Sequence, residues 1–525
     1  MTATPTPQEA ALRIQASAVL SVIERRAERA EEEGNLANLV ALSELSPIYD
    51  PTTMVIFGRR GAGKTHTLLH LLKRLREDGD VGVYIDMRKI SSNAGMYEDL
   101  EVPFGTRCTN ILVDVISEVH NELYASAVLG RDALLTERLD DIGPALDAMG
   151  AAVTEIRVTG ETAVSRTAGA ASRRSRSSSA TVDLSKRPTA RGQRESLTST
   201  ESTAGVEVTE RGRAHVYIHL GTLDKAIGQI LEAMGGARLW ILIDEWSGGV
   251  PYELQPILAD MIRRIFASFG RVAVKIGAVE HQSRFLLQEG RGYVGLELGA
   301  DTAETLSLDA AQVIGASHNR AVAFIRAMLN EHFRAAAPSG LVEMVPHPIA
   351  LCFQSQAFDY LVLASEGNPR DAINLCSKAA RTAKELTIRL EHVISASDDY
   401  FWNTKYKNIE GHQELEDLFE DLMDNSLSRG RRTILFERTD PRRRAMDKLY
   451  DRRLVHLIRS GVRVSDSPRL YDLYAIDFGC YAERILRNEM RWANDGFVSP
   501  SRFVLDGGSE SWKEAVLRRR GRSRR

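Results

Sequence analysis

The sequence predicts an α/β fold in which a parallel β-sheet, covered by helices on both faces, is followed by an all-helical domain and a winged-helix domain. Short, almost wholly apolar runs alternate with amphipathic helical segments up to about residue 307, and this is the pattern of a parallel sheet buried on both faces. The strand-like runs then stop, and only helical periodicity continues to about residue 405. Beyond that point an acidic helix, a short strand, a basic helix and a hairpin follow in order, which together predict the winged helix.

The individual elements follow from apolar and amphipathic runs along the chain. We expect the strands of the sheet at MVIFG (54–58), VGVYIDM (81–87), LWILIDE (239–245), VAVKIGAVE (272–280) and YVGLEL (293–298). Helical periodicity occurs at residues 9–33, 65–77, 110–128, 223–234, 250–269, 317–333 and 368–386. The last domain is expected to contain helices at 413–427 and 441–458, a strand at 433–438 and a hairpin at 463–477.

The composition is that of an ordinary globular protein. The chain has 525 residues, a formal net charge of -3, 43% hydrophobic residues and 26% charged residues, values that exclude bulk disorder and a collagen-like repeat. No apolar run reaches the roughly 18 residues of a membrane-spanning helix, and the first residues lack the features of a secretory signal, so we expect no membrane partner. The 4 cysteines form no CxxC pair, which argues against a zinc site and favours a reducing cytoplasm.

One internal stretch, at about residues 150–215, departs from this pattern. Between Ser165 and Thr203 it is crowded with Ser, Thr and Arg and holds few large apolar side chains. Such a segment buries too little apolar surface to offset the entropy that is lost on ordering. We therefore expect a mobile insertion in the sheet domain, either a solvated linker or a segment whose arginines contact nucleic-acid phosphates.

An eight-residue run after the first predicted strand matches the pattern G-x-x-x-x-G-K-[ST] in full. Its residues are Gly58, Arg59, Arg60, Gly61, Ala62, Gly63, Lys64 and Thr65, and we count His66 with them as nucleotide-binding. Glycines let backbone N–H groups curl around phosphate oxygens, and the following helix directs its positive end at the anion. Lys64 is expected to neutralise the β- and γ-phosphates, and Thr65 to place its hydroxyl on Mg²⁺.

A second motif, LWILIDEW, ends a strand in adjacent carboxylates. Asp244 is expected to hold Mg²⁺ through water at the carboxyl end of the strand, where ligands of such sheets bind. Glu245 is placed to orient or deprotonate an attacking water. Together with the phosphate loop, this pair predicts ATP and Mg²⁺ as cofactors and ATP hydrolysis as the reaction.

With these motifs, the chain resembles the AAA+ ATPases, and more closely their initiator-like branch, which is related to origin-recognition and Cdc6 proteins. The resemblance covers roughly residues 35–480 and rests on the phosphate loop, the Asp-Glu pair, a later strand with a polar end, and a Gly-x-Pro-Arg helix start. It implies an ATPase core, a helical lid and a winged helix.

The resemblance also implies roles for residues outside the two motifs. The sensor-1 position falls at the end of the fourth strand, on Glu280 or His281. The sensor-2 arginine corresponds to Arg370, which would point from the lid toward the γ-phosphate. An arginine finger that acts across a subunit interface corresponds to Arg284 or Arg291, and it implies an oligomer or an AAA+ partner.

The elements and motifs divide the chain into regions with distinct expected roles. They are an N-terminal helix (1–34), a P-loop ATPase core with the Ser/Thr/Arg-rich insertion (35–307), a helical lid domain (308–405), a winged-helix-like domain (406–490) and a basic C-terminal tail (491–525). ATP is then expected between the core and the lid.

The leading functional hypothesis is an ATP-hydrolysing AAA+ protein that couples its nucleotide state to the winged helix. Duplex DNA is the expected partner of the winged helix and the basic tail, because clustered cations beside a hairpin are typical of phosphate-backbone contact. The cations that crowd one helix are Arg442, Arg443, Arg444, Lys448, Arg452 and Arg453.

The alternative is a signalling or scaffold NTPase, for example in a defence system, whose winged helix packs against protein and does not bind DNA. Asp440, Asp447 and Asp451 interleave with the basic helix. A continuous basic face on this helix would favour DNA, whereas acids that pair with the arginines would favour packing. A metabolic kinase is a weaker third hypothesis, because the Asp-Glu pair argues against it.

Overall fold

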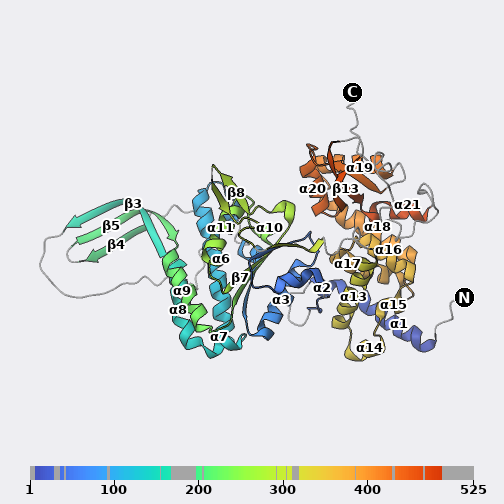
Figure 1. Cartoon of the computed structure of the whole chain (residues 1–525), viewed down its shortest axis with the longest axis horizontal. Coiled ribbons are helices and arrows are strands. Elements are labelled where there is room, and N and C mark those ends of the chain that lie inside the picture. Colours follow the sequence, from blue (N-terminus) through green and yellow to red (C-terminus); the bar gives the residue numbers. More distant parts are fainter. Residues whose placement is uncertain are drawn as a thin grey trace, which may run out of the picture. The chain divides into compact units, whose positions relative to one another are not determined.

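The protein is described by a computed structural model (Figure 1). The described residues are 6–28, 36–40, 43–91, 95–153, 155–166, 197–203, 206–290, 292–302, 304–309, 318–384, 386–427, 432–464 and 468–487. The chain forms two compact units, of which one is Ile90–Gly236 and the other, larger unit combines Met1–Lys89 with Ala237–Arg525.

The larger unit is built on a 5-stranded parallel sheet with the strand order β10-β1-β7-β6-β2. Its strands are β1 Met54–Phe57, β2 Val81–Asp86, β6 Leu239–Asp244, β7 Val272–Ala278 and β10 Glu304–Ser307. Every residue of β6 and β7 is buried, as the continuous apolar runs predict for the centre of a parallel sheet. The α/β prediction is confirmed, with a strand order in which β7 separates the phosphate-loop strand from the strand of the Asp-Glu pair.

The expected fifth strand at 293–298 is wrong. Its first residues form β9 Gly292–Gly295, which pairs antiparallel with β8 Leu286–Glu289 outside the main sheet. The fifth strand is β10, whose sequence ETLS holds one large apolar residue. Because an edge strand pairs on one side only, it needs less apolar surface than a central strand, and its sequence signal is correspondingly weak.

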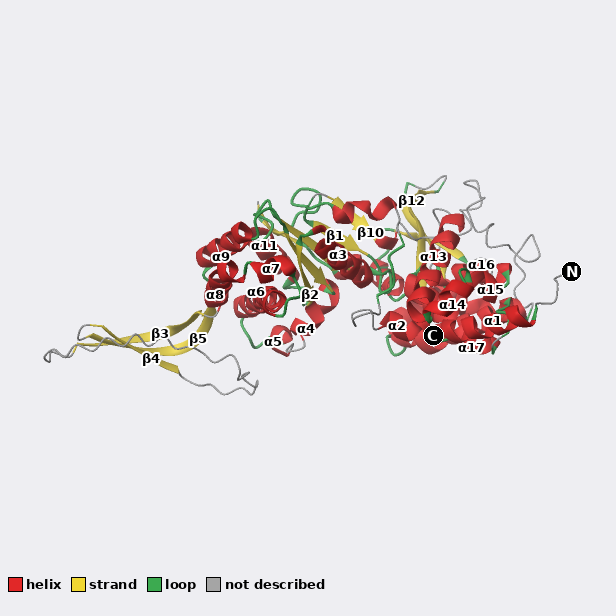
Figure 2. Cartoon of the chain, turned by 90° about the horizontal axis from the view of Figure 1, so that it is seen from below, coloured by secondary structure: helices red, strands yellow, loops and turns green. Residues whose placement is uncertain are grey.

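Helices cover the sheet and complete the core. Helix α3 starts directly after the phosphate loop and packs Leu68, Leu71 and Leu75 into the same hydrophobic cluster as Ile56 and Leu242; Figure 2 shows it beside the strands. The helices and turns that belong to this part are η1 Ser43–Tyr49, α3 Lys64–Asp78, α4 Met87–Ser91, α10 Trp246–Gly249, α11 Gln255–Ile265 and η2 Glu280–Gln282.

A helical domain follows the sheet along the chain. Its elements are α13 His318–Ala336, α14 Ser339–Met344, α15 Pro348–Cys352, α16 Ser355–Ser365, α17 Pro369–Ala383, α18 Leu390–Tyr400, η3 Phe401–Lys405 and η4 Tyr406–Asn408. The expected N-terminal helix at 9–33 is two helices, α1 Pro7–Leu20 and α2 Ile23–Glu28. Both belong to the core of the helical domain, where Leu20 and Ile23 share a cluster with Leu361 and Ala379.

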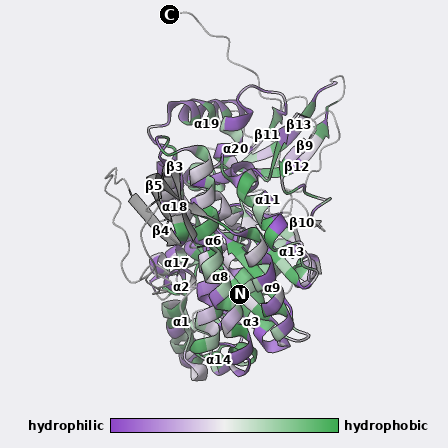
Figure 3. Ribbon diagram, turned by 90° about the vertical axis from the view of Figure 1, so that its left-hand side faces the viewer, coloured by the Kyte–Doolittle hydropathy of each residue, from purple (hydrophilic) through white to green (hydrophobic). Residues whose placement is uncertain are grey.

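The C-terminal module, which we define as residues 413–487, shows the predicted order of helix, strand, helix and hairpin. Its elements are α19 Gln413–Ser426, β11 Thr433–Glu437, α20 Arg443–Asp451, β12 Val455–Arg463, β13 Leu470–Ile476, η6 Phe478–Tyr481 and α21 Ala482–Leu486. The strands form an antiparallel sheet in the order β11-β13-β12. Hydrophilic residues colour much of α19 in Figure 3, in keeping with its acidic sequence.

The basic helix of the module is shorter than expected. It was predicted over 441–458, but α20 ends at Asp451 and β12 begins at Val455. Between them Arg453 adopts the left-handed conformation, with a φ of 63°, and this conformation ends a helix. The winged-helix assignment of the module stays a prediction.

The smaller unit holds helices and a separate antiparallel sheet. Its elements are α5 Gly95–Glu98, α6 Phe104–Val128, α7 Ala133–Glu137, α8 Leu139–Val153, α9 Leu220–Ala233, β3 Glu155–Arg166, β4 Leu197–Thr203 and β5 Val206–Tyr217. The expected mobile insertion therefore contains strands, in the order β3-β5-β4, while its most Arg/Ser-rich part, 167–196, lies outside the described residues. Among the residues that are described, no helix combines the length and apolarity that a membrane crossing requires.

Candidate functional site

The predicted phosphate loop joins β1 to α3 and bends tightly back on itself. Gly61 and Gly63 adopt φ angles of 85° and 97°, which residues with a Cβ rarely tolerate. A Cβ on Gly61 would also lie 2.6 Å from the Cβ of Arg370. Lys64 Nζ donates to the carbonyl oxygens of Gly58 at 2.7 Å and Arg59 at 3.2 Å, so the side chain lies folded against the loop.

A cavity of about 470 Å³ lies at this loop, within the size range of small-molecule sites. Its polar lining includes the loop residues from Arg60 to His66 together with Arg88, Glu245 and Arg370. Its apolar lining comes from the N-terminal segment and the helical domain: Leu39, Val40, Leu45, Phe324, Met328 and Ile373. A nucleotide combines a polyanion with a flat apolar base, and this lining offers partners for both.

The two expected Mg²⁺ residues lie together. Thr65 Oγ1 donates to Asp244 Oδ2 at 2.6 Å, although the two residues are 179 positions apart in the sequence. Tyr84 also donates to Asp244 Oδ2, at 2.9 Å. A hydroxyl and a carboxylate are hard oxygen donors of the kind that Mg²⁺ takes in addition to water and phosphate oxygens, so this pair fits the ion. Within the described part of the chain, no group of three or more His, Cys, Asp or Glu residues is arranged to hold a metal.

Glu245 lines the cavity directly after β6. It adopts a left-handed φ of 54°, an uncommon conformation for a residue other than glycine. Arg88, after β2, lies with Nη1 3.6 Å from Glu245 Oε1 and with Nη2 2.9 Å from Asp86 Oδ2. The ion pair between Arg88 and Asp86 joins residues two positions apart, whereas the contact with Glu245 joins the ends of two strands, so no local pattern in the sequence marks it.

The start of α17 contacts the outer side of the phosphate loop. The backbone N–H of Arg370 donates to Gly61 O at 3.2 Å, and Asn368 Nδ2 donates to Arg60 O at 3.2 Å. Asn368 also caps the helix, since its side chain accepts from the N–H of Asp371. Arg370, the predicted sensor-2 residue, lines the cavity.

The remaining predicted residues lie elsewhere. Val279, and neither Glu280 nor His281, lines the cavity at the end of β7, while His281 Nδ1 lies 3.3 Å from Asp451 Oδ1 of the C-terminal module. Arg284 is outside the cavity lining and donates its backbone N–H to Gln255 Oε1 at 2.6 Å. Arg291 lies outside the described residues.

Arg59 also departs from its expected role at the nucleotide. Its guanidinium is buried and binds Asp309 Oδ1 at 3.0 Å, and it does not line the cavity. Although burial opposes the charge, Asp309 raises the pKa of Arg59 above its ordinary value. Asp309 belongs to no recognisable sequence motif, and only its contact with Arg59 shows that it supports the phosphate loop.

Burial is also the largest influence on the pKa values of two residues of the cavity, Lys64 and His66. It lowers the pKa of Lys64 from its ordinary value, against the attraction of Asp244 and Glu245. It lowers the pKa of His66 to about 4, and the neighbouring His332 acts in the same direction. The rings of His66 and His332 lie 5.9 Å apart between centroids, and both line the cavity.

Acidification is expected to destabilise the fold through His66. The unfolded chain takes up a proton at the ordinary pKa of 6.5 and the folded chain at about 4, so the stability from the neutral ring is present above pH 6.5 and is lost as the pH falls toward 4. At 1.36 kcal/mol per pKa unit, the loss is up to about 3 kcal/mol. Urea denaturation at several pH values measures it. His66→Asn should flatten this pH dependence, and the exposed His347→Asn should leave it unchanged; equal profiles for His66→Asn and the parent chain would contradict the assignment.

Comparisons with known proteins add little at the sequence level. No protein-family model matches the chain, and no curated protein matches it significantly. Among solved structures, the chain is similar to the ORC1 protein of Aeropyrum pernix in complex with DNA, with 11% identity, a TM-score of 0.31, and coverage of 84% of this chain and 91% of that chain. At such a TM-score the likeness carries no functional argument, and the fold assignment rests on the sheet itself.

Proposed function

We propose that this chain is an AAA+ type ATPase that binds ATP with Mg²⁺ between the phosphate loop and the helical domain and hydrolyses it to ADP and phosphate. The observation that carries the proposal is the composition of one cavity. The phosphate loop, Glu245 and Arg370 line it together, and the pair of Thr65 and Asp244 adjoins it at a 2.6 Å hydrogen bond.

Each residue of the site has a distinct role in the proposed reaction. Lys64 and the loop N–H groups bind the phosphates, and Mg²⁺, held by Thr65 and Asp244, would supply positive charge to the β- and γ-phosphate oxygens. Glu245 orients the attacking water and accepts its proton. This carboxylate is what favours hydrolysis over transfer of the phosphoryl group to another substrate.

Two further arginines serve the same reaction. Arg88 Nη1 lies 3.6 Å from Glu245 Oε1 and positions this carboxylate. Arg370 reaches the cavity from the helical domain and would contact the γ-phosphate, so that the helical domain responds to its loss. Either Arg284 or Arg291 is proposed as the finger that acts on a neighbouring subunit, which implies an oligomer or an AAA+ partner.

The C-terminal module is proposed to respond to the nucleotide state, with duplex DNA as its partner in the initiator-like hypothesis. One observation favours the alternative of a signalling or scaffold NTPase. Arg442 pairs with Asp440 and Asp421, and Arg443 pairs with Asp447 and Asp472. These pairs reduce the positive field of α20, and they support a module that packs against protein. We propose the cytoplasm as the compartment, in keeping with a sequence of only 4 cysteines and no CxxC pair.

The test of nucleotide binding is Lys64→Met. Removing the charge-assisted contacts to phosphate is expected to weaken Mg-ATP binding by about 10- to 100-fold, because hydrogen bonds to charged groups contribute roughly 1.5–3 kcal/mol. Titration with a fluorescent ATP analogue measures the dissociation constant. Lys73→Met, an exposed lysine on the same helix, is the matched control. Equal affinity in the parent chain and in Lys64→Met would refute the proposed function.

The effect of duplex DNA on ATP hydrolysis distinguishes the two hypotheses for the C-terminal module. ATP hydrolysis is measured with and without duplex DNA at low salt, for the parent chain and for Arg444→Ala/Lys448→Ala, which removes two exposed cations of α20. Stimulation by DNA that this variant loses supports the initiator-like hypothesis, provided that Lys407→Ala, an exposed lysine of the helical domain, retains it. An equal rate of ATP hydrolysis with and without DNA, together with no DNA binding by the parent chain, supports the signalling or scaffold NTPase.

A further inference from the structure

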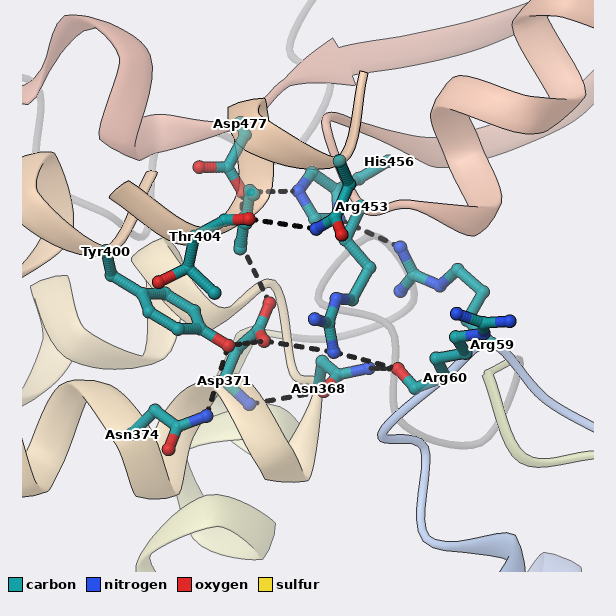
Figure 4. Close-up of polar contacts among 12 residues, drawn as sticks. Arg59, Arg60, Asn368, Asp371, Asn374, Tyr400, Thr404, Arg453, His456 and Asp477 are labelled. Carbon is teal, nitrogen blue, oxygen red and sulfur yellow. Dashed lines mark hydrogen bonds and ion pairs between the residues drawn. The ribbon is translucent and has the colours of Figure 1, made fainter. Parts of the chain in front are cut away.

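The C-terminal module contacts the phosphate loop directly. Arg453 Nη1, at the end of α20, donates to the carbonyl oxygen of Arg60 at 3.0 Å. The same oxygen accepts from Asn368 of the helical domain at 3.2 Å, and Figure 4 shows both side chains pointing toward it. One peptide group of the loop is therefore held from its outer side by two other parts of the chain.

The same peptide group carries the N–H of Gly61, a residue that lines the cavity. In a trans peptide the C=O and the following N–H point in opposite directions, and the described chain has no cis peptide bond. The N–H of Gly61 therefore points away from Arg453, and Gly61 lines the cavity. A donor on the carbonyl polarises the peptide and strengthens the N–H as a donor to phosphate.

The fit around Gly61 is close on both sides. A Cβ at this position would lie 2.8 Å from Arg453 Nη1 and 2.8 Å from Asn368 Oδ1. The loop is thus enclosed between the helical domain and the C-terminal module, and its position depends on both.

Buried charges fix Arg453 in place. Its Nη1 lies 3.2 Å from Oδ1 of Asp371, whose side chain is fully buried. Oδ2 of Asp371 lies 2.8 Å from Nζ of Lys405, which in turn lies 2.6 Å from Asp477 Oδ2. Although burial opposes the ionised form, Arg453 and Lys405 lower the pKa of Asp371 well below its ordinary value.

A second contact from the module reaches the neighbouring loop residue. Arg59 Nη1 lies 2.9 Å from His456 Nδ1, and His456 Nε2 lies 2.9 Å from Asp477 Oδ2. The Arg59 guanidinium also lies over the ring of Tyr450, 4.7 Å from its centroid. Such a network is poor at adding stability, because desolvation opposes the attraction of the charges, but it defines one position for the loop.

On the basis of the proposed function, we propose that Arg453 is a positioning residue of the nucleotide site: it holds the Arg60–Gly61 peptide in the phosphate-binding conformation and so couples nucleotide binding to docking of the C-terminal module on the loop. Coupling of this kind is reciprocal, so a bound nucleotide stabilises the docked module to the same extent. Because the contact is to the loop backbone, it serves ADP and ATP alike. Arg370, by contrast, is proposed to serve the γ-phosphate and hence ATP alone.

The test is Arg453→Met in the full chain. We expect the affinities for Mg-ADP and Mg-ATP to fall by a similar factor of about 10, within the roughly 5- to 150-fold range of ordinary coupling. The KM for ATP should rise with kcat largely unchanged, since binding in the ground state and the transition state is lost equally. Arg453→Lys, which keeps the charge and a donor, should restore part of the affinity.

Arg463→Met is the matched control, because Arg463 is an exposed arginine of β12 in the same module, and the variant should bind both nucleotides as the parent chain does. Hydrogen exchange of the segment 448–456 supplies the reciprocal readout: ADP should slow it in the parent chain and not in Arg453→Met. If Arg453→Met does not fold, Arg453→Lys is compared with the parent chain in the same measurements.

Three other outcomes would contradict either the inference or the proposed function. Unchanged affinity in a folded variant overturns the inference, and so does a loss confined to ATP, because Arg453 would then act on the γ-phosphate. Failure of the parent chain to bind either nucleotide refutes the proposed function itself, and it is recognised before any variant is made.

Discussion

Replacing Glu245 by Gln is expected to lower the kcat for ATP hydrolysis by about 100- to 10,000-fold, the usual contribution of a positioned general base. The amide keeps the shape of the side chain but neither accepts the proton of the attacking water nor pairs as strongly with Arg88. ATP binding should persist, because the phosphate loop and the pair of Thr65 and Asp244 are unaltered. Phosphate release and nucleotide titration on the same preparation measure the two quantities separately.

The matched control is Glu253→Gln, since Glu253 is an exposed carboxylate on the segment that follows the same strand. It should hydrolyse ATP at the rate of the parent chain. Hydrolysis by Glu245→Gln at more than a tenth of the parental rate would remove Glu245 from its proposed role. Loss of binding together with hydrolysis would instead indicate that Glu245 supports the shape of the site.

Replacing Asp371 by Ala is expected to destabilise the protein by about 3–5 kcal/mol. The carboxylate is fully buried and lies 3.2 Å from Arg453 and 2.8 Å from Lys405. Its removal deprives Arg453 of this carboxylate and leaves Lys405 with Asp477 alone. Removing one member of a buried ion pair costs this much because the remaining charge is neither solvated nor paired. The midpoint of urea denaturation measures the change.

Asp399→Ala is the comparison for Asp371. Asp399 pairs with Lys378 with its side chain 50% exposed, and pairs that solvent reaches contribute about 0–1 kcal/mol. The two variants remove the same group from neighbouring helices of one domain. A shift for Asp371→Ala no larger than that for Asp399→Ala would contradict the expected cost of removing one member of a buried network of charges.

Local patterns in the sequence predicted the parts of the site that lie on one continuous segment. The phosphate loop and the Asp-Glu pair are such segments, because each depends on a strand that ends at a fixed point and on the residues that directly follow. The alternation of buried strands and amphipathic helices likewise predicted a parallel sheet. Since the carboxyl ends of parallel strands lie at one edge, the proximity of Thr65 and Asp244 followed from the same argument.

Contacts between segments that are far apart along the chain could not be predicted from the sequence. The ion pair between Arg88 and Glu245 joins the ends of two strands, and β10 was missed because an edge strand needs little apolar surface. The sensor-1 expectation on Glu280 or His281 came from resemblance, whereas in the structure Val279 lines the cavity at this strand end.

The sequence by itself determined that this chain has a phosphate loop, a carboxylate pair after a buried strand, and a series of elements that makes an α/β core with helical and mixed domains behind it. Only the tertiary structure decided that the C-terminal module reaches the loop, through a contact between Arg453 and Arg60 that are 393 positions apart. The reason is physical. Motifs and periodicity report on the chain over a few turns or one strand, whereas the docking of one domain on another depends on shape and buried charge that no single segment contains.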